Sequence, residues 1–389
     1  MNRREFIRAS ALAGATAGFG SLAVAQKVLP SPLPVLAPHA VSQQDKSDRT
    51  SARDPMAIQR GTLVVEGLAA GYLAEDHLKA AETGGVNCIV QGGGADFQSY
   101  AHTFNFLERR KERVVQARTV REIRETHRQG KIAMIFEWQS ADALGESFNQ
   151  PLGSPETPLR AHYEMGLRII GLCYNVANVF GAGNLEPHTG LSRAGHRLVE
   201  EIHKLQMVLD VGGHTGEQTS LDAIAISSGV PAICTHTNVA ALCDNPRCVS
   251  DRLIEAIART GGVVGLTAFN DYLARGRKQT NVPRTPQVAL DKYLDQFDYI
   301  RKLVGVDHAG LGPDFVKGWN IDYEHGVNRE IMTPEMVSEG TWLYVKGFED
   351  IDELPNVTRG LIERGWSTEE IHKVLGENWL RVYEQVWGA

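Results

Sequence analysis

Short apolar runs that alternate with amphipathic helical patterns constrain the fold of this chain more than any other sequence feature. Eight runs have the length and composition of buried parallel strands. They are Leu63–Glu66, Val86–Gln91, Lys131–Glu137, Leu167–Tyr174, Met207–Val211, Val230–His236, Gly262–Thr267 and His308–Asp314. Between them, residues 192–205 and 251–259 repeat apolar side chains at three and four positions, which is typical of helices. The alternation predicts an α/β fold of the (β/α)8 TIM-type barrel class rather than an open doubly wound sheet.

The N-terminal residues predict export from a bacterial cytoplasm. Arg3 and Arg4 form a paired-arginine segment, and the stretch 9–25 that follows carries no charge. Residues 1–25 are therefore predicted to be a twin-arginine signal peptide, and the mature protein is expected in the periplasm or otherwise outside the cytoplasm. An uncleaved membrane anchor is the alternative. The stretch is shorter than the roughly 20 apolar residues that span a bilayer, and no later segment is long enough, so no transmembrane segment is expected in the mature chain.

The rest of the chain divides into a tether and one domain. Residues 26–60 are rich in proline and polar side chains, which predicts an exposed tether. Residues 61–389 show no further break in composition and are expected to form a single barrel domain that ends in helices near 357–364 and 368–386. Ser367, with Glu370 three residues later, is a capping signal for the last of these.

Composition excludes several classes of function. With 42% hydrophobic residues, 22% charged residues and a formal net charge of −7, the chain is typical of a globular enzyme and not of a nucleic-acid-binding protein. No P-loop or dinucleotide-binding glycine pattern is present, and the glycines at 92–94 are a weak phosphate signal. The five cysteines do not form a disulfide framework, because Cys88, Cys173 and Cys234 lie inside apolar runs. Whether Cys243 and Cys248 pair or bind a metal stays open.

Four strand ends carry residues that bind metals. One predicted strand ends on Glu137, another on His236 and a third on Asp314, while His214 follows the strand that ends at Val211. In a parallel barrel all of these ends meet on the same face, where barrel enzymes hold their chemistry. Two imidazoles and two carboxylates predict a site for a divalent metal, with zinc, iron, manganese and cobalt all acceptable.

Five ordered motifs resemble the membrane dipeptidases, a family of dizinc peptidases on a TIM-type barrel of the amidohydrolase-like kind. The resemblance covers most of the span from residue 61 to residue 381. The motifs read DVGGH at 210–214, PAICTHTN at 231–238, NPRCVSD at 245–251, DHAGLGPDF at 307–315 and IHKVLGENWLR at 371–381.

This resemblance implies a role for each matching residue. Glu137 would be the metal-bridging carboxylate, and His214 and His236 would bind one metal. Asp314 would bind the other metal and move protons. Arg247 would receive the terminal carboxylate of the substrate, for which a guanidinium offers a two-pronged hydrogen bond. The implied substrate is a dipeptide or a similar small amide, cleaved by a metal-activated water.

The sequence also departs from the family pattern. Where the family's first strand carries a His-x-Asp pair of ligands, this chain has Leu68 and Ala70, neither of which coordinates a metal. One zinc ion per chain is therefore expected rather than two. Tyr174 stands where the family has a histidine that steadies the transition state, and it would donate one hydrogen bond there.

Each of these residues also has an interpretation in which it takes no part in catalysis or binding. The two histidines would then be structural, Glu137 a loop carboxylate, Asp314 a turn cap, and Arg247 a surface partner of a nearby aspartate. Three functions stay open from sequence: a metal-dependent hydrolase, which is favoured, a lyase or isomerase on the same barrel, and a degenerate barrel that only binds a small molecule or peptide. A homodimer is left open.

Overall fold

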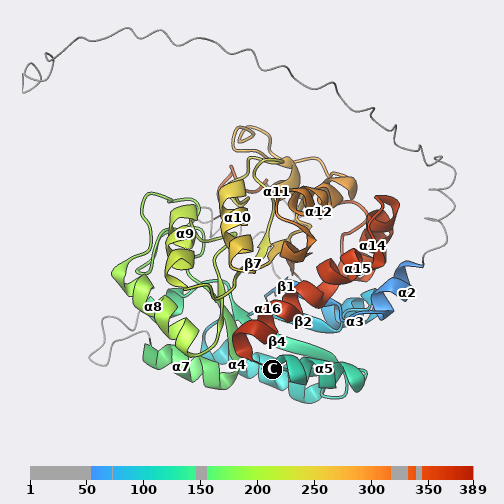
Figure 1. Ribbon diagram of the computed structural model, residues 1–389, viewed down its shortest axis with the longest axis horizontal. Coiled ribbons are helices and arrows are strands. Elements are labelled where there is room, and N and C mark those ends of the chain that lie inside the picture. The colour runs from blue at the N-terminus through green and yellow to red at the C-terminus, as the bar shows by residue number, and fades with distance from the viewer. Residues whose placement is uncertain (1–53, 72, 146–155, 317–331, 339–343, 389) are drawn as a thin grey trace, which may run out of the picture. The chain divides into compact units, whose positions relative to one another are not determined.

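A closed ring of parallel strands forms the centre of the molecule. The structure, a computed structural model, describes residues 54–388 except 72, 146–155, 317–331 and 339–343. Figure 1 shows the arrangement of its elements. The strands are β1 (Val65–Ala70), β2 (Cys88–Gly92), β3 (Val114–Gln116), β4 (Ile132–Trp138), β5 (Leu167–Gly171), β6 (Val208–Asp210), β7 (Ala232–Thr237), β8 (Val264–Leu266), β9 (Ala309–Leu311) and β10 (Phe315–Val316).

The pairing of the strands closes the barrel. Their order is β10-β1-β2-β4-β5-β6-β7-β8-β9, with β3 added beside β4, and every pair is parallel. β9 pairs with β8, and β10 pairs with β1 through Ala69 and Phe315. Since only three residues separate β9 from β10, the two act as one interrupted strand that joins the ends of the sheet. The predicted α/β barrel is therefore confirmed.

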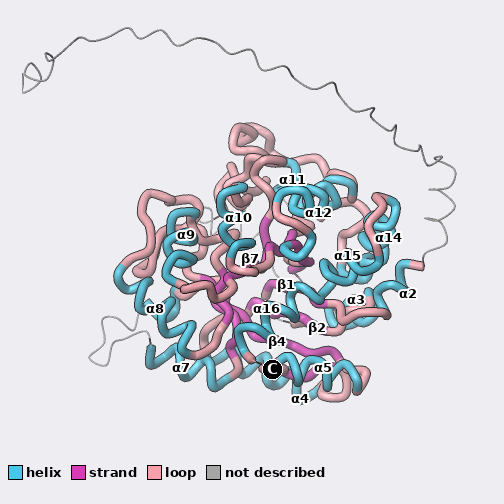
Figure 2. Tube along the Cα trace, viewed as in Figure 1, coloured by secondary structure: helices cyan, strands magenta, loops and turns pink. Residues whose placement is uncertain are grey.

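Helices surround the strands, as Figure 2 shows with the strands in magenta at the centre. The helices are α2 (Pro55–Arg60), α3 (Glu75–Gly84), α4 (Phe97–Arg109), α5 (Val120–Arg128), α6 (Asp142–Gly145), α7 (Glu156–Met165), α8 (Arg193–Lys204), α9 (Glu217–Ile226), α10 (Asp251–Arg259), α11 (Asn270–Ala274), α12 (Asp291–Leu303), α14 (Leu354–Glu363), α15 (Thr368–His372) and α16 (Asn378–Trp387). Short 3₁₀ turns lie at η2 (Val306–His308) and η3 (Ile351–Glu353), and a π-helical turn, η4 (Lys373–Glu377), joins α15 to α16. The capping box of Ser367 and Glu370 is present at the start of α15.

The predicted strands all correspond to observed ones; most differ by one to three residues at an end, and the first and the last differ for structural reasons. The first begins and ends later than predicted, because Leu68 and Ala69 continue the buried strand beyond Glu66. The last is interrupted between residues 311 and 315, where Pro313 has no amide hydrogen to donate and Asp314 has a φ of 63°. β3 was not predicted, because three residues give too short an apolar pattern to recognise.

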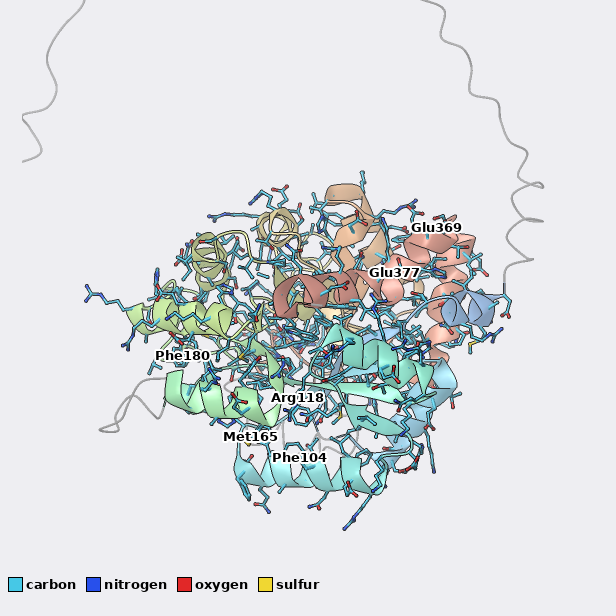
Figure 3. The ribbon with its side chains drawn as sticks, turned by 60° about the horizontal axis from the view of Figure 1, so that its bottom comes forward. Phe104, Arg118, Met165, Phe180, Glu369 and Glu377 are labelled. Carbon is cyan, nitrogen blue, oxygen red and sulfur yellow. The ribbon has the colours of Figure 1, made fainter. Side chains whose placement is uncertain are left out.

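The interior of the barrel is filled by side chains and is covered by the C-terminal helix. One apolar cluster combines inward residues of β1, β2, β4, β5, β6 and β7 with Trp379, Tyr383 and other residues of α16. In Figures 1 and 3, α16 crosses the centre of the molecule in dark red, and Glu377 is labelled in Figure 3 where that helix begins. Trp379 is fully buried, and its indole nitrogen donates to the carbonyl oxygen of Leu311 at 3.1 Å.

Glycines on three strands make room for the Trp379 ring. A Cβ atom on Gly67 of β1 or on Gly310 of β9 would lie 2.6 Å from a ring atom, and one on Gly265 of β8 would lie 3.0 Å away. At Gly67 and Gly265 the added Cβ atom would also lie 2.2 Å from the carbonyl oxygen of Leu311 and 2.1 Å from that of Thr235, so these positions need glycine because both the neighbouring backbone and the ring approach closely. The C-terminal helix is thus part of the barrel core.

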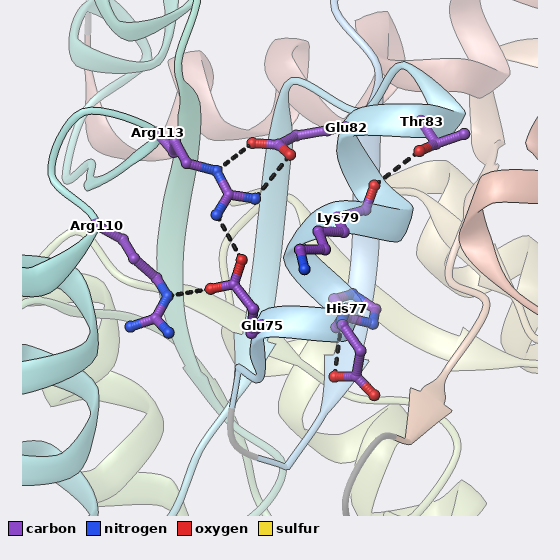
Figure 4. A network of polar contacts seen from close by, with 8 residues as sticks. Glu75, His77, Lys79, Glu82, Thr83, Arg110 and Arg113 are labelled. Atoms are coloured by element: carbon purple, nitrogen blue, oxygen red, sulfur yellow. Dashed lines mark hydrogen bonds and ion pairs between the residues drawn. The ribbon is translucent and has the colours of Figure 1, made fainter.

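A network of ion pairs holds α3 to the segment that follows α4 (Figure 4). Arg113 binds Glu82 with two hydrogen bonds of 2.7 Å and reaches Glu75 at 2.6 Å. Arg110 also donates to Glu75. These arginines hold the pKa of Glu75 well below its usual range, at about 2. The network joins two elements that are separated by β2 and α4 in the sequence.

The domain starts earlier than predicted. Residues 55–60, which were predicted to belong to the tether, form helix α2, which Asp54 caps. Gln59 in this helix is buried and donates to the Thr358 hydroxyl at 2.9 Å, so α2 is packed against α14. The predicted signal peptide and most of the predicted tether lie outside the described residues. Among the residues described, no helix is long and apolar enough to cross a membrane.

The cysteines behave as the sequence predicted for a protein without a disulfide framework. Cys88, Cys173 and Cys234 are buried, and all five thiols are free. The two thiols whose state was left open, Cys243 and Cys248, are therefore not joined by a disulfide.

Candidate active site

A cavity of about 530 Å³ opens where the strands end. Ala70 at the end of β1, Gly92 at the end of β2 and Trp138 at the end of β4 contribute to its wall. Tyr174, His214 and Asp314, which were all predicted to belong to the site, also line it. The cavity therefore lies on the face of the barrel where the sequence placed the chemistry.

His214 and His236 meet directly. Their Nε2 atoms lie 3.0 Å apart, and the two rings are inclined by 60° with centroids 4.9 Å apart. Both side chains are almost fully buried. Burial lowers the pKa of each imidazole well below its usual value, and the positive charge of Arg247 adds to the effect on both. Both rings are therefore neutral near pH 7, which is the form that binds metals.

Hydrogen bonds at the other ring nitrogens define the proton positions. Nδ1 of His214 lies 2.7 Å from the side-chain oxygen of Asn175, so Nδ1 carries the hydrogen and donates it. Nδ1 of His236 lies 2.9 Å from the hydroxyl of Thr235, which gives its own hydrogen to Asp210. Nδ1 of His236 is therefore a donor as well. Each Nε2 atom is left with a lone pair that points at the other ring.

Glu137 is a buried carboxyl group without a hydrogen-bond partner in the described structure. It is fully inaccessible to solvent, and both of its carboxyl oxygens lack a partner. Burial raises the pKa of Glu137 well above its usual value, and the charges of Asp210 and Asp314 add to this. A buried carboxyl group with both oxygens free is costly, so it calls for a proton or a cation beside it.

Asp314 faces the cavity from the break between β9 and β10. Its backbone amide donates to the carbonyl oxygen of Leu68 at 3.2 Å, which holds it beside β1. Its φ of 63° lies in the left-handed region, which aspartate tolerates better than most residues. Burial raises the pKa of Asp314 to about 7, while the charge of Arg247 opposes the shift.

Tyr174 and Arg247 contact the same histidine from different sides. The Tyr174 ring stacks on His214 with centroids 3.8 Å apart and planes inclined by 20°. Arg247 is 1% exposed, and its Nη2 atom donates to Nε2 of His214 at 3.3 Å. The guanidinium carbon also lies 5.1 Å from the centre of the Tyr272 ring. Arg247 is therefore no surface residue, and it lies behind the cavity wall rather than on it.

The donor atoms are of the types that bind a divalent metal, but the distance between the two imidazole nitrogens is shorter than in a metal site. In the described part of the chain, no group of three or more His, Cys, Asp or Glu side chains is placed to hold a metal. Two converging imidazole nitrogens and the unpartnered carboxyl of Glu137 are nevertheless suitable ligands. Two ligands of a tetrahedral zinc ion lie roughly 3.4 Å apart. The 3.0 Å between the Nε2 atoms would therefore have to widen by about 0.4 Å.

The residues that orient the histidines were not predicted from the sequence. Asn175 follows Tyr174 directly and has a φ of 63°, and Thr235 precedes His236. Asp210 accepts hydrogen bonds from the Thr235 hydroxyl and from the backbone amide of Gly212. Thr235 could have been recognised, because it directly precedes His236 and ligating histidines commonly donate their second nitrogen to an oxygen; Asn175 and Asp210 are not adjacent to a predicted histidine ligand.

Comparison with known proteins identifies the relatives of the chain. The model of the family described as "Membrane dipeptidase (Peptidase family M19)" matches residues 94–339 and 335–388. A Klebsiella pneumoniae protein described as an uncharacterized protein in the pqqA 5' region is 32% identical over 237 residues, which are 59% of this chain and 76% of that protein. Dipeptidase tcpJ of Claviceps purpurea is 27% identical over 67% of this chain, and the match spans 54% of its own length.

Solved structures have the same fold. An amidohydrolase from Pseudomonas aeruginosa superposes with a TM-score of 0.74 and 26% identity, over 87% of this chain and all of that one. A metallo peptidase from Rhodobacter sphaeroides, solved with a phosphinate mimic of the dipeptide L-Ala-D-Ala, has a TM-score of 0.65 and 21% identity, and covers 84% of this chain and all of its own. The second likeness is evidence for the fold alone.

Proposed function

The chain belongs to the membrane dipeptidase family and is a metallo-hydrolase of the dipeptidase type, and from this premise we propose that it cleaves a dipeptide or a similar small amide with one divalent metal bound at His214 and His236. Zinc is the expected metal, with Glu137 as the carboxylate ligand. The observation that carries the proposal is the pair of neutral imidazoles whose lone pairs converge at 3.0 Å. Leu68 and Ala70, beside Asp314, offer no side-chain donor for a second metal.

Residues around the metal position supply the remaining parts of a hydrolase. A bound divalent metal would acidify a water molecule and polarise the amide carbonyl. Asp314 would accept the proton from the attacking water, and its pKa of about 7 suits proton exchange near neutrality. Tyr174 would donate its hydroxyl hydrogen to the carbonyl oxygen as negative charge develops there. Thr235 and Asp210 keep His236 in the tautomer that leaves Nε2 free.

The wall of the cavity supports a substrate with an apolar side chain. Trp138, Tyr174, Phe269 and Tyr272 line it, and aromatic rings of this kind bind apolar groups well. The charged side chains among the described lining residues are aspartates, Asp314 and two others at positions 96 and 142. They favour a substrate with a free amino group over one rich in carboxylates. Arg247 would receive the terminal carboxylate only if the side chains in front of it move.

Export would place this activity in the periplasm. The paired arginines at positions 3 and 4 support passage by the twin-arginine route, which carries folded proteins with their metals already bound. The substrate would then be a small peptide or amide that is present outside the cytoplasm.

Two matched variants test the proposal. Asp314→Asn is expected to lower kcat for an aromatic dipeptide by about 10²-fold or more while the metal content stays unchanged. His214→Ala is expected to lose both the metal and the activity. The assay measures dipeptide cleavage by chromatography and metal content by plasma mass spectrometry, in water enriched in ¹⁸O. Turnover without ¹⁸O in the product would favour the lyase or isomerase hypothesis, and undiminished turnover by Asp314→Asn would refute the role of that residue.

A further inference from the structure

We infer that Gln139 supplies a neutral donor, the oxygen of its side-chain amide, to the metal centre proposed at His214, His236 and Glu137. The inference rests on the proposed function, because it needs a metal at these two histidines. Gln139 directly follows β4 and stands two positions after Glu137, and side-chain atoms of both residues lie within 3.0 Å of a Cβ atom placed on Gly92. It also lines the cavity, which places its amide between the barrel interior and the substrate space.

The amide oxygen of Gln139 is already at the imidazole that would bind the metal. Oε1 lies 2.9 Å from Nε2 of His214, and the same nitrogen lies 3.0 Å from Nε2 of His236. Since Asn175 and Thr235 take the ring hydrogens at the Nδ1 atoms, these three contacting atoms all present lone pairs. The lone pair of Nε2 of His214 therefore meets one acceptor at 2.9 Å and another at 3.0 Å, and such contacts are repulsive unless a positive charge lies beside them.

Arg247 satisfies only part of this need. Its Nη2 atom donates to Nε2 of His214 at 3.3 Å. Nε2 of His236 contacts Nε2 of His214 in the described structure and receives no hydrogen bond from Arg247 there. The contacts that the described structure gives to Nε2 of His236 and Oε1 of Gln139 are both with Nε2 of His214, so a cation among these three acceptors would be favourable. A divalent metal satisfies all three acceptors at once.

The other end of the amide, its nitrogen, lies beside Gly92 of β2. A Cβ atom placed on Gly92 would lie 2.8 Å from Nε2 of Gln139 and 3.0 Å from a carboxyl oxygen of Glu137. The amide nitrogen and the carboxyl group thus border the same small space, which exists because residue 92 is glycine. The amide nitrogen therefore lies toward Gly92 and Oε1 toward His214, and no hydrogen bond joins the amide to Glu137 in the described structure.

A glutamine oxygen would also supply a ligand where too few His, Cys, Asp or Glu side chains are grouped with the two histidines. No third His, Cys, Asp or Glu is placed with the two histidines among the residues that the structure describes. With Glu137 as the proposed carboxylate ligand, a neutral oxygen from Gln139 would still leave a divalent metal with a net positive charge. Such a mixed set suits manganese, iron, cobalt and zinc alike, so we expect moderate affinity and little selectivity among them.

Metal affinity and the cobalt spectrum test the inference without an activity assay. The full-length protein, stripped of metal, is titrated with Zn²⁺ and Co²⁺ against a competing chelator, as wild type, Gln139→Ala and Gln139→Glu. We expect Gln139→Ala to raise the metal Kd at least about tenfold and Gln139→Glu to lower it, because a carboxylate is the stronger ligand. The visible bands of bound Co²⁺ are expected to shift in both variants, since a ligand has changed.

The control is Ser140→Ala, which removes a neighbouring cavity hydroxyl that donates to Asp142. It is expected to leave both the Kd and the cobalt spectrum unchanged, and thermal unfolding verifies that each variant is folded. A Kd within twofold of wild type for Gln139→Ala, together with an unaltered cobalt spectrum, would overturn the inference and leave the proposed function standing. Absence of metal binding by the wild type would overturn the proposed function as well.

Discussion

The hydroxyl of Thr235 is the connection through which the barrel orients His236, so its removal is a quantitative test. Thr235→Val keeps the size and branching of the side chain, and no cavity is expected. It takes away the acceptor for the Nδ1 hydrogen of His236 and the donor to Asp210. A buried donor without a partner costs about 1–3 kcal/mol, and a hydrogen bond to a charged group contributes about 1.5–3 kcal/mol.

These two losses predict that Thr235→Val lowers the free energy of unfolding by about 3 kcal/mol. Asp210 retains the backbone amides of Gly212 at 3.0 Å and Thr235 at 3.4 Å, which keeps the cost below the full sum. The freed imidazole can turn, so metal affinity is expected to fall about 10–100-fold. Urea unfolding and metal titration measure the two effects on the same sample.

Thr103→Val is the matched control for this prediction. Thr103 is also buried, and its hydroxyl donates to the backbone carbonyl of Ser99 inside α4 and not to either histidine. It is expected to cost about 1 kcal/mol and to leave metal affinity unchanged. If Thr235→Val matched the control in both measurements, the proposed orientation of His236 would be refuted.

Three further predictions concern the core, the surface and the chemistry. Trp379→Ala should lower the free energy of unfolding by about 3–5 kcal/mol, because it empties the space made by three glycines; a loss below about 1 kcal/mol in urea unfolding would contradict this. Glu75 has a pKa of about 2 against an ordinary 4.5, so its stabilisation is present above pH 4.5 and is lost as the pH falls toward 2. The wild type should exceed Glu75→Gln by about 1 kcal/mol at pH 7, since the site is partly exposed, and the difference should vanish near pH 2 in unfolding titrations. Tyr174→Phe should lower kcat about 10²-fold with little change in KM, and an equal kcat would exclude the hydroxyl from the reaction.

The periodicity of the sequence was sufficient to predict the barrel. Each buried strand is an apolar run bounded by turn residues, and the helices between them repeat with the helical period, so strand number and order follow. The exceptions lie where local pattern is weak. β3 has three residues, and the break at Asp314 depends on a backbone conformation that no periodicity reports.

The site was predictable in its residue types but not in its contacts. Strand ends placed His214, His236, Glu137 and Asp314 on one face, and the structure brings the two histidines into contact. Which atoms they turn to one another depends on partners such as Asn175, and a side-chain amide has no sequence pattern that marks it as a partner. For the same reason, a role for Gln139 was not predicted from the sequence.

Anomalous X-ray diffraction tests the central proposal most directly. Crystals of the full-length protein grown with saturating zinc or manganese are measured at the absorption edge of that metal. The proposal predicts one anomalous peak per chain, about 2.0–2.2 Å from Nε2 of His214 and from Nε2 of His236. Absence of a peak at these nitrogens under saturating metal, or a peak held by other residues, would contradict it.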